Sequence, residues 1–300
     1  MSTSSVGRLA QLVREHRTVV LSGAGLSTES GIPDYRGPHG SLRARAPMSY
    51  REFVQSAENR RRYWARSAAG WARIRDARPN AGHLAVARLE AAGHVVGVIT
   101  QNVDRLHHAA GSRRVIELHG ALADVRCLDC GRVEARDQLQ RRMQAANPGW
   151  TESAAAAAVA APDGDADLSP REVSTFSVPA CLACGGTLKP DVVFFGENVP
   201  APRVEQAMQL VDSAGALLVV GSSLAVFSGF RFARRAAERG IPIAIVNQGS
   251  TRADELAELR LDARTGEVLP LLAAVLDDGL GTDDPGDEHG RQPQPAGGPA

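Results

Sequence analysis

Short apolar runs rich in β-branched residues recur along the chain, and each ends in a glycine-rich or polar cluster. They predict strands over residues 18–22, 95–100, 216–220 and 243–246, with a helical stretch over 83–92. Apolar strands that alternate with helices are typical of a mostly parallel α/β sheet. Ligands bind such sheets beyond the carboxyl ends of the strands, so we expect the functional site among these polar clusters.

Two regions interrupt the alternation. The region 47–82 is Arg-rich and helical in character, and it contains Tyr63 and two tryptophans. The region 126–188 contains all four cysteines and an Ala-rich stretch over 153–167, which we interpret as a surface loop or a frayed helix. These regions predict a smaller domain inserted into the sheet domain.

We therefore predict an α/β protein in which a Rossmann-like parallel sheet domain carries a smaller inserted zinc-binding and helical domain. The expected ranges are 1–46, 83–125 and 189–276 for the sheet domain, 47–82 for a helical module and 126–188 for a zinc-binding module. The remaining residues, 277–300, are rich in Gly, Pro and Asp and predict a disordered tail.

Charge and composition narrow the function classes. The 300 residues include 34 basic and 34 acidic side chains, which argues against a nucleic-acid binder because phosphate contacts need a basic excess. The basic set holds a single lysine, Lys189. The N-terminus lacks an apolar signal core, and Gly and Ser interrupt the uncharged stretch 213–230, which argues against a membrane span. We expect a soluble cytoplasmic protein with reduced cysteines.

The four cysteines form two pairs, Cys127-x-x-Cys130 and Cys181-x-x-Cys184. Each pair can present two thiolates to one Zn²⁺, and two pairs complete a tetrahedron. Four thiolate ligands leave no open coordination position, so we expect a structural zinc rather than a catalytic one. The alternatives are two redox dithiols or free buried cysteines.

Two other motifs follow predicted strands. Gly23-Ala-Gly25 opens the cluster after the first strand, where glycines let the backbone approach a pyrophosphate. The match to G-x-G-x-x-G is incomplete because position 28 is Thr, and a tight turn without a ligand fits equally well. Gln101-Asn-Val-Asp104 places Asn102 and Asp104 on one side of an extended segment. The alternative role of Asp104 is an N-cap for the next helix.

These motifs together resemble the sirtuins, the NAD-dependent protein deacylases, over about residues 8–276. The signature loop is 23–37, and the other motifs occur in the family's order: Thr100-Gln-Asn-Val-Asp104, His119-Gly120, the cysteine pairs, Val193-Phe-Phe-Gly-Glu197, Gly221-Ser-Ser-Leu224 and Val246-Asn247. Tyr35 and the run 189–197 resemble the class II branch.

The resemblance implies NAD⁺ as co-substrate and one structural Zn²⁺. The implied NAD⁺ contacts are Gly23, Ala24, Gly25, Ser27, Thr28, Ile32, Pro33, Asp34, Tyr35, Arg36, Gln101, Asn102, Asp104, Gly221, Ser222, Ser223, Asn247, Gln248, Gly249 and Thr265. The catalytic residues it implies are His119, as general base, and Asn102, which would bind the ribose or the attacking water. In this chemistry the acyl group of a modified lysine ends on ADP-ribose and nicotinamide is released.

The resemblance also implies the partners, which are proteins with acylated lysines. Val193, Phe194, Phe195, Gly196 and Glu197 resemble the segment that pairs with the substrate backbone; an ordinary buried strand is the alternative. No pattern in the sequence indicates an oligomeric state.

The acyl pocket is the least defined part of the site. Tyr63 and Arg66 resemble the pair with which class III sirtuins bind acidic acyl chains, and the alternative is that Arg66 is simply solvated. Two other functions stay open: a protein mono-ADP-ribosyltransferase that uses the same NAD⁺ site, and a non-catalytic NAD- or zinc-dependent binding module.

Overall fold

The computed structural model describes residues 3–35, 47–150 and 173–278 of the chain. Arg36, the Ala-rich stretch 153–167 and residues 279–300 of the expected tail lie outside the described residues.

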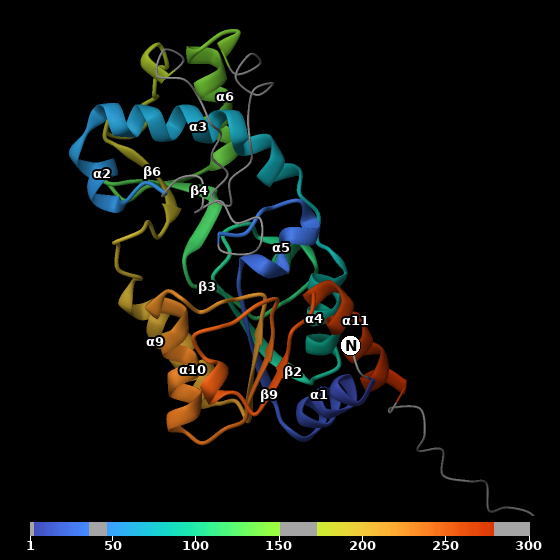
Figure 1. The fold of residues 1–300 in the computed structure, drawn as a ribbon. Coiled ribbons are helices and arrows are strands. Elements are labelled where there is room, and N and C mark those ends of the chain that lie inside the picture. Colours follow the sequence, from blue (N-terminus) through green and yellow to red (C-terminus); the bar gives the residue numbers. More distant parts are fainter. Residues whose placement is uncertain (1–2, 36–46, 151–172, 279–300) are drawn as a thin grey trace, which may run out of the picture.

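A six-stranded parallel sheet forms the larger part of the molecule (Figure 1). Its strands lie in the order β3-β2-β1-β7-β8-β9, which is the doubly wound order of a Rossmann-like sheet, so the predicted fold class is confirmed. Their bounds are β1 Thr18–Ser22, β2 Val95–Thr100, β3 Val115–Glu117, β7 Ala216–Val220, β8 Ile243–Val246 and β9 Leu259–Leu261. The direction of the strand order reverses between β1 and β7, which is where such sheets bind ligands.

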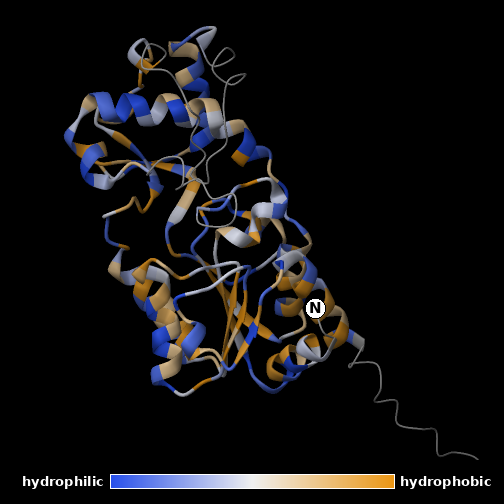
Figure 2. Cartoon of the chain, viewed as in Figure 1, coloured by the Kyte–Doolittle hydropathy of each residue, from blue (hydrophilic) through white to orange (hydrophobic). Residues whose placement is uncertain are grey.

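Helices cover both faces of this sheet (Figure 1), and its strands are mostly hydrophobic (Figure 2). One face packs against α1 Thr3–Glu15, α4 Ala81–Ala91 and α11 Thr265–Asp278, and the other against α9 Ala201–Asp212 and α10 Phe227–Glu238. The apolar spacing explains the packing. In α1, Val6, Leu9, Ala10 and Val13 recur at helical intervals, and all four are buried in the core.

A smaller module stands beyond the carboxyl edge of the sheet (Figure 1). It is built from α2 Tyr50–Gln55, α3 Ala57–Asp76, α6 Arg136–Ala146 and the antiparallel strands β4 Gly120–Cys127, β5 Val133–Ala135 and β6 Leu188–Val192. Trp64 of α3 donates its indole N–H to the carbonyl of Leu188, 3.1 Å away, and so joins the helices to the strands. The helices and the strands therefore share one core.

Arg136 is the most polar element of that core. Its side chain is 1 % exposed, and its guanidinium lies 5.4 Å from the Trp64 ring and 5.0 Å from the Trp71 ring. It donates to Gln140 and to the carbonyl and hydroxyl of Ser67. Burial lowers the pKa of Arg136 to about 10, which still leaves it charged at pH 7. A stacked, hydrogen-bonded guanidinium thus connects α3 to α6.

The predicted strands have the expected bounds, and four other features of the chain differ from expectation. The four predicted strands coincide with β1, β2, β7 and β8, whereas β3 and β9, of three residues each, escaped prediction. The segment 193–197 is not a strand: β6 ends at Val192, and only Phe195 forms an isolated bridge, to Ser49. Helix α11 extends into the expected tail, through Asp278, because Leu276 is still buried.

The shorter helical segments are α5 Leu106–Ala109 and the 3₁₀ turns η1 Ala24–Leu26, η2 Thr28–Ser30 and η4 Asp254–Leu256. No helix within the described ranges combines the length and the apolar character that crossing a membrane requires.

Candidate active site

A cavity of about 820 Å³ opens at the carboxyl ends of the parallel strands and beneath the smaller module. It gathers clusters that are far apart in the sequence. The predicted residues that line it are Gly23, Ala24, Gly25, Ser27, Ile32, Pro33, Asp34, Tyr35, Tyr63, Gln101, Asn102, Asp104, His119, Val193, Phe194, Phe195, Gly196, Glu197, Gly221, Ser222, Ser223, Asn247, Gln248 and Gly249. The strand ends and the extended segment after β6 therefore face one space.

The two glycine turns at the switch point pack directly against each other. A Cβ on Gly23 would lie 2.7 Å from Cβ of Ser222, and one on Gly25 would lie 2.9 Å from the carbonyl oxygen of Gly221. Gly221 has φ +60°, and its own Cβ would lie 2.3 Å from the amide nitrogen of Leu26. Glycine is needed here for the fit between the turns, which leaves the polar backbone of both on the cavity wall.

Asn102, Ser27 and Asp104 form one hydrogen-bonded group in the cavity wall. The amide of Asn102 donates to the carbonyl of Gly23 at 3.1 Å and to the hydroxyl of Ser27 at 3.0 Å. Ser27 in turn donates to Oδ2 of Asp104 at 2.6 Å. The other carboxylate oxygen, Oδ1, accepts the backbone N–H of Leu106, the first residue of α5, although the N-cap position of that helix is Arg105.

His119 lines the cavity just before β4. Its Nδ1 lies 3.0 Å from the carbonyl oxygen of Gln101, which can only accept, so Nδ1 carries the proton. Nε2 is then an acceptor, and the Ser228 hydroxyl lies 2.9 Å from it. Burial lowers the pKa of His119 to about 4, so the ring is neutral at pH 7. The geometry therefore presents a neutral imidazole with its acceptor nitrogen toward the cavity.

Gly120 allows His119 to lie close to β6. It has φ +80°, and a Cβ would lie 2.0 Å from the carbonyl oxygen of Asp191 on β6. Beside it, the backbone N–H of Val193 donates to the carbonyl of His119 at 2.8 Å. The close approach of β4 and β6 thus couples the histidine to the segment after β6.

That segment is held by Lys189. Its ammonium lies 3.0 Å from Oε2 of Glu197 and 4.9 Å from the centroid of the Phe194 ring, and the side chain is 7 % exposed. Glu197 also accepts the backbone N–H of Phe194 at 2.8 Å. Phe194 packs against Tyr63, with the ring centroids 5.2 Å apart. The segment 193–197 is therefore a fixed wall of the cavity.

The comparisons with known proteins agree with this site. The Sir2 family model matches residues 23–228. The chain is 54% identical over 271 residues to NAD-dependent protein deacetylase 1 of Streptomyces coelicolor, covering 90% of each chain. It is 53% identical over 261 residues to NAD-dependent protein deacetylase 2 of Bradyrhizobium diazoefficiens, covering 87% of this chain and 94% of the relative. The chain belongs to the Sir2 family.

Solved structures of the Sir2 family have the same fold. A complex of a mutant Sir2 homologue with ADP-ribose has a TM-score of 0.73 at 30% identity and covers 94% of this chain and 99% of its own. A complex of Sir2 with a peptide and NAD⁺ has a TM-score of 0.69 at 30% identity and covers 91% and 97%. The predicted sirtuin resemblance is confirmed, and its class II assignment stays a prediction.

The cysteines of this Sir2 family protein meet at one point of the smaller module. The sulfurs of Cys127, Cys130, Cys181 and Cys184 all lie within 4.8 Å of one another, with Cys127–Cys184 at 3.5 Å and Cys130–Cys181 at 3.8 Å. A tetrahedron of Zn–S bonds of about 2.3 Å has edges of about 3.8 Å. The four thiols are therefore positioned to bind one zinc ion. Both knuckles end in a left-handed glycine, Gly131 and Gly185.

Some predicted residues lie away from the cavity wall. Thr28 donates its hydroxyl to the carbonyl of Gly25, and Thr265 is buried at the start of α11. Arg66 is half-buried on α3 and does not line the cavity, although Tyr63 does. The contacts predicted for these side chains stay predictions.

Sequence reasoning missed several residues of the site. Ser228 and Asp262 line the cavity, as do the apolar side chains of Met48, Ile74 and Leu122. None belongs to a motif with a readable spacing. Ser228 is 109 positions from its partner His119, so no local signal in the sequence could have paired them.

Two buried histidines behind the wall were also missed. His83 accepts the backbone N–H of Asn80 at Nδ1, and its Nε2 faces the Ser27 hydroxyl at 3.5 Å. His107 lies 2.8 Å from the hydroxyl of Ser22 at the end of β1. Burial lowers the pKa of both, that of His107 to about 3. Both are neutral and support the strand ends without reaching the cavity surface.

Proposed function

We propose that this chain is an NAD-dependent protein deacetylase that transfers the acetyl group of a modified lysine to ADP-ribose and releases nicotinamide. The observation that carries the proposal is His119, a neutral imidazole with its acceptor nitrogen toward the cavity that the glycine turns line. The curated relatives named NAD-dependent protein deacetylase support the same activity.

The cavity fits NAD⁺ by the chemistry of its wall. The turns Gly23–Gly25 and Gly221–Ser223 line the cavity at the strand ends, and glycine turns at this place suit a pyrophosphate. NAD⁺ supplies the ADP-ribose that accepts the acyl group. Ser27 holds Asn102 and Asp104 in place, so an amide and a carboxylate face the nicotinamide half without needing to reorganise.

His119 acts as the general base in this proposal. Its Nε2 accepts a proton from a ribose hydroxyl, and its Nδ1–H stays bonded to the carbonyl of Gln101, which stabilises the imidazolium that forms. The Ser228 hydroxyl occupies Nε2 in the structure, so it must rotate away or pass the proton on. Because the ring is neutral above about pH 5, it can accept a proton at physiological pH.

The cavity wall supports an uncharged acyl group. The charged side chains that line it within the described residues are the carboxylates of Asp34, Asp104, Glu197 and Asp262, and no Lys or Arg of that part lines it. An acidic acyl chain would therefore lack a cation among these residues. We propose acetyl or another neutral acyl chain as the substrate group. The acidic preference through Arg66 is the alternative to exclude.

The decisive assay incubates purified protein with NAD⁺ and an acetyl-lysine peptide and follows deacetylated peptide and free nicotinamide. We expect equal amounts of both, dependent on NAD⁺. ADP-ribose attached to a protein target, without loss of acetyl groups, would instead identify an ADP-ribosyltransferase. For the acyl group, Arg66→Met should change kcat/KM for acetyl and succinyl peptides equally, and a selective loss on succinyl peptides would restore the acidic-acyl role.

A further inference from the structure

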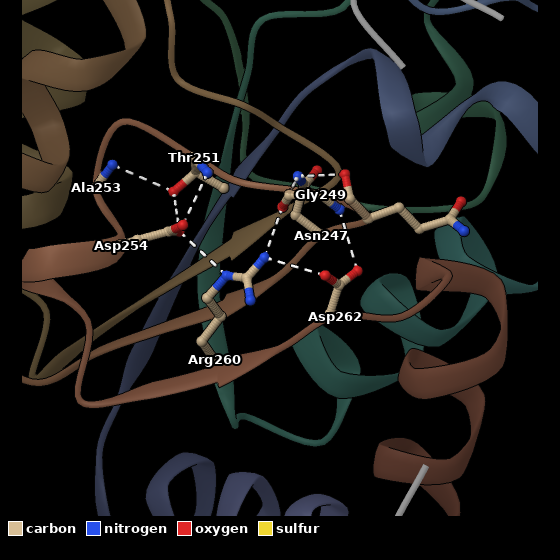
Figure 3. Close-up of polar contacts among 8 residues, drawn as sticks. Asn247, Gly249, Thr251, Ala253, Asp254, Arg260 and Asp262 are labelled. Carbon is tan, nitrogen blue, oxygen red and sulfur yellow. Dashed lines mark hydrogen bonds and ion pairs between the residues drawn. The ribbon is translucent and has the colours of Figure 1, made fainter. Parts of the chain in front are cut away.

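The ends of β8 and β9 close one end of the cavity with a network of polar side chains (Figure 3). Asp262 directly follows β9 and lines the cavity. Its Oδ1 accepts the backbone N–H of Gly249 at 3.0 Å, and its Oδ2 accepts from the guanidinium of Arg260 at 3.2 Å. Arg260 also donates to the carbonyl of Gly249 at 2.8 Å and lies 3.2 Å from Asp254. The carboxylate of Asp262 is thus fixed at the cavity wall.

The strand order assigns this end to the adenosine half of a dinucleotide. His119, Asn102 and Asp104 lie on the β2 and β3 side of β1, so the reacting ribose belongs there. A pyrophosphate over the glycine turns at β1 and β7 sends the other nucleoside toward β8 and β9. β9 lies three strand spacings from β1, roughly 14 Å. Asn247 and Asp262 are the polar side chains that come directly after these last two strands and line the cavity.

From this geometry we infer that Asp262 binds the hydroxyls of the adenosine ribose and selects NAD⁺ against NADP⁺; the inference rests on the proposed function. Each carboxylate oxygen accepts one hydrogen bond within the network and keeps a further lone pair for a ribose hydroxyl. The side chain is 57% exposed, so a ligand can reach it. A 2′-phosphate in the same place would meet a like charge.

Arg260 adds a second part to the inference. This guanidinium would attract a 2′-phosphate, but Asp262 and Asp254 both neutralise it. Removing the charge of Asp262 alone should turn an end of the cavity that repels a 2′-phosphate into one that attracts it. Two like charges about 5 Å apart change a binding constant by about fourfold in bulk water and by more than about 100-fold at the lower effective dielectric of a protein surface. A half-exposed carboxylate lies between these limits, so we expect a change of about tenfold or more, to which the unmasked guanidinium adds.

The test measures binding directly, by titrating ADP-ribose and 2′-phospho-ADP-ribose into wild-type protein, Asp262→Asn and Asp254→Asn in a calorimeter. Asn keeps an acceptor for the Gly249 N–H, and Asp254→Asn makes the same charge change beside Arg260 at a residue that does not line the cavity. We expect the wild type to prefer ADP-ribose, and Asp262→Asn to lower that preference by about tenfold or more. Asp254→Asn should leave the preference within about twofold of the wild type.

Activity supplies an independent readout. Asp262→Asn should raise KM for NAD⁺ with an acetyl peptide and leave kcat nearly unchanged, because Asp262 is remote from the reacting ribose. Asp262→Ala serves if the Asn variant fails to fold. An unchanged preference in a folded Asp262 variant, or an equal shift in Asp254→Asn, overturns the inference. A wild-type protein that does not bind ADP-ribose at all refutes the proposed function instead.

Discussion

The parallel sheet and the smaller module are built from different side chains. The two cores that flank the sheet consist of Val, Leu, Ile and Ala with one fully buried aromatic ring, Phe232. The core of the module contains Phe53, Tyr63, Trp64, Trp71, Phe176 and Phe194, around the charged Arg136 and beside four thiols. All three tryptophans of the chain belong to the module.

This difference in core composition follows from the backbone structure of each region. The six parallel strands satisfy their own polar groups in the sheet and need only aliphatic packing between the layers. The described part of the module has only three antiparallel strands, so large rings, a stacked cation and a metal must supply its cohesion. The polar groups of the active site stand on the edge of the sheet, outside its core. Changes in the module should therefore reduce stability, and changes at the sheet edge should reduce chemistry.

The largest expected effect is the loss of the metal. Cys181→Ala removes one of four thiolates, and structural zinc contributes about 10–16 kcal/mol in small zinc-binding peptides, so the module should lose its folded structure. Zinc content and thermal unfolding measure this loss. Leu182→Ala, in the same knuckle and 77% exposed, should leave both nearly unchanged. Folded, active wild-type protein that contains no zinc would contradict the prediction.

The next effect is purely chemical. His119→Ala removes the general base and should lower kcat/KM for deacetylation by about 10²–10⁴-fold. The unfolding temperature and ADP-ribose binding should stay close to the wild type, because the variant removes only the ring and its two hydrogen bonds at the cavity wall. His108→Ala, at a histidine 44% exposed to solvent, is the matched control and should keep full activity. Wild-type turnover by the folded His119 variant would exclude its catalytic role.

Acid should lower the unfolding free energy of the protein, and this effect should be of intermediate size. His83, His107 and His119 are buried and neutral, with pKa values below the ordinary 6.5, so the unfolded chain binds protons that the folded chain refuses. The unfolding free energy should fall as the pH drops from about 6.5 toward 4, with each histidine adding a slope of up to about 1.4 kcal/mol per pH unit.

Urea unfolding at pH 7, 6 and 5 measures this slope. His107→Gln should flatten it, since one of the three protonation sites is removed. Equal unfolding free energies at pH 7 and pH 5 would contradict the assignment of neutral, buried histidines.

The smallest effect concerns Ser228. Ser228→Ala removes the hydroxyl that donates to Nε2 of His119, which should lower kcat/KM by about 2- to 10-fold. This donation favours the neutral ring, so its loss raises the pKa of His119 and moves the acid limb of the pH–rate profile upward. Ser228→Thr keeps the hydroxyl and should restore the profile. A uniform loss of rate at every pH would mean that Ser228 acts only on the structure.

The sequence predicted the parts of the site that each lie within one local motif. The glycine turn after β1, the polar cluster after β2 and the cysteine pairs were readable because strand, turn and ligand spacing are local. Ser228 and Asp262 were not, because their roles arise from contacts between elements that only the folded chain brings together.

Three features of the fold escaped prediction for related reasons. β9 has only three residues, too few for an apolar period, although its end carries Asp262. The segment 193–197 looked like a strand because it is apolar, but the contacts of Lys189 and Glu197 hold it in an irregular path. The shared core of helices and strands in the module likewise depends on the pairing of Trp64 with Leu188 across 124 positions.

The buried lysine has a consequence for the protein's own chemistry. Lys189 is the one lysine in 300 residues, and its ammonium is enclosed by Glu197, Phe194 and Tyr50. The other members of the Lys and Arg set are all arginines, whose guanidinium groups acyl donors do not modify at neutral pH. An enzyme of this kind displays no lysine for acylation, so it can neither accumulate the modification that it removes nor compete with its substrates for its own cavity. Amine-directed reagents should accordingly leave the side chains of the folded protein unlabelled and reach Lys189 only after unfolding.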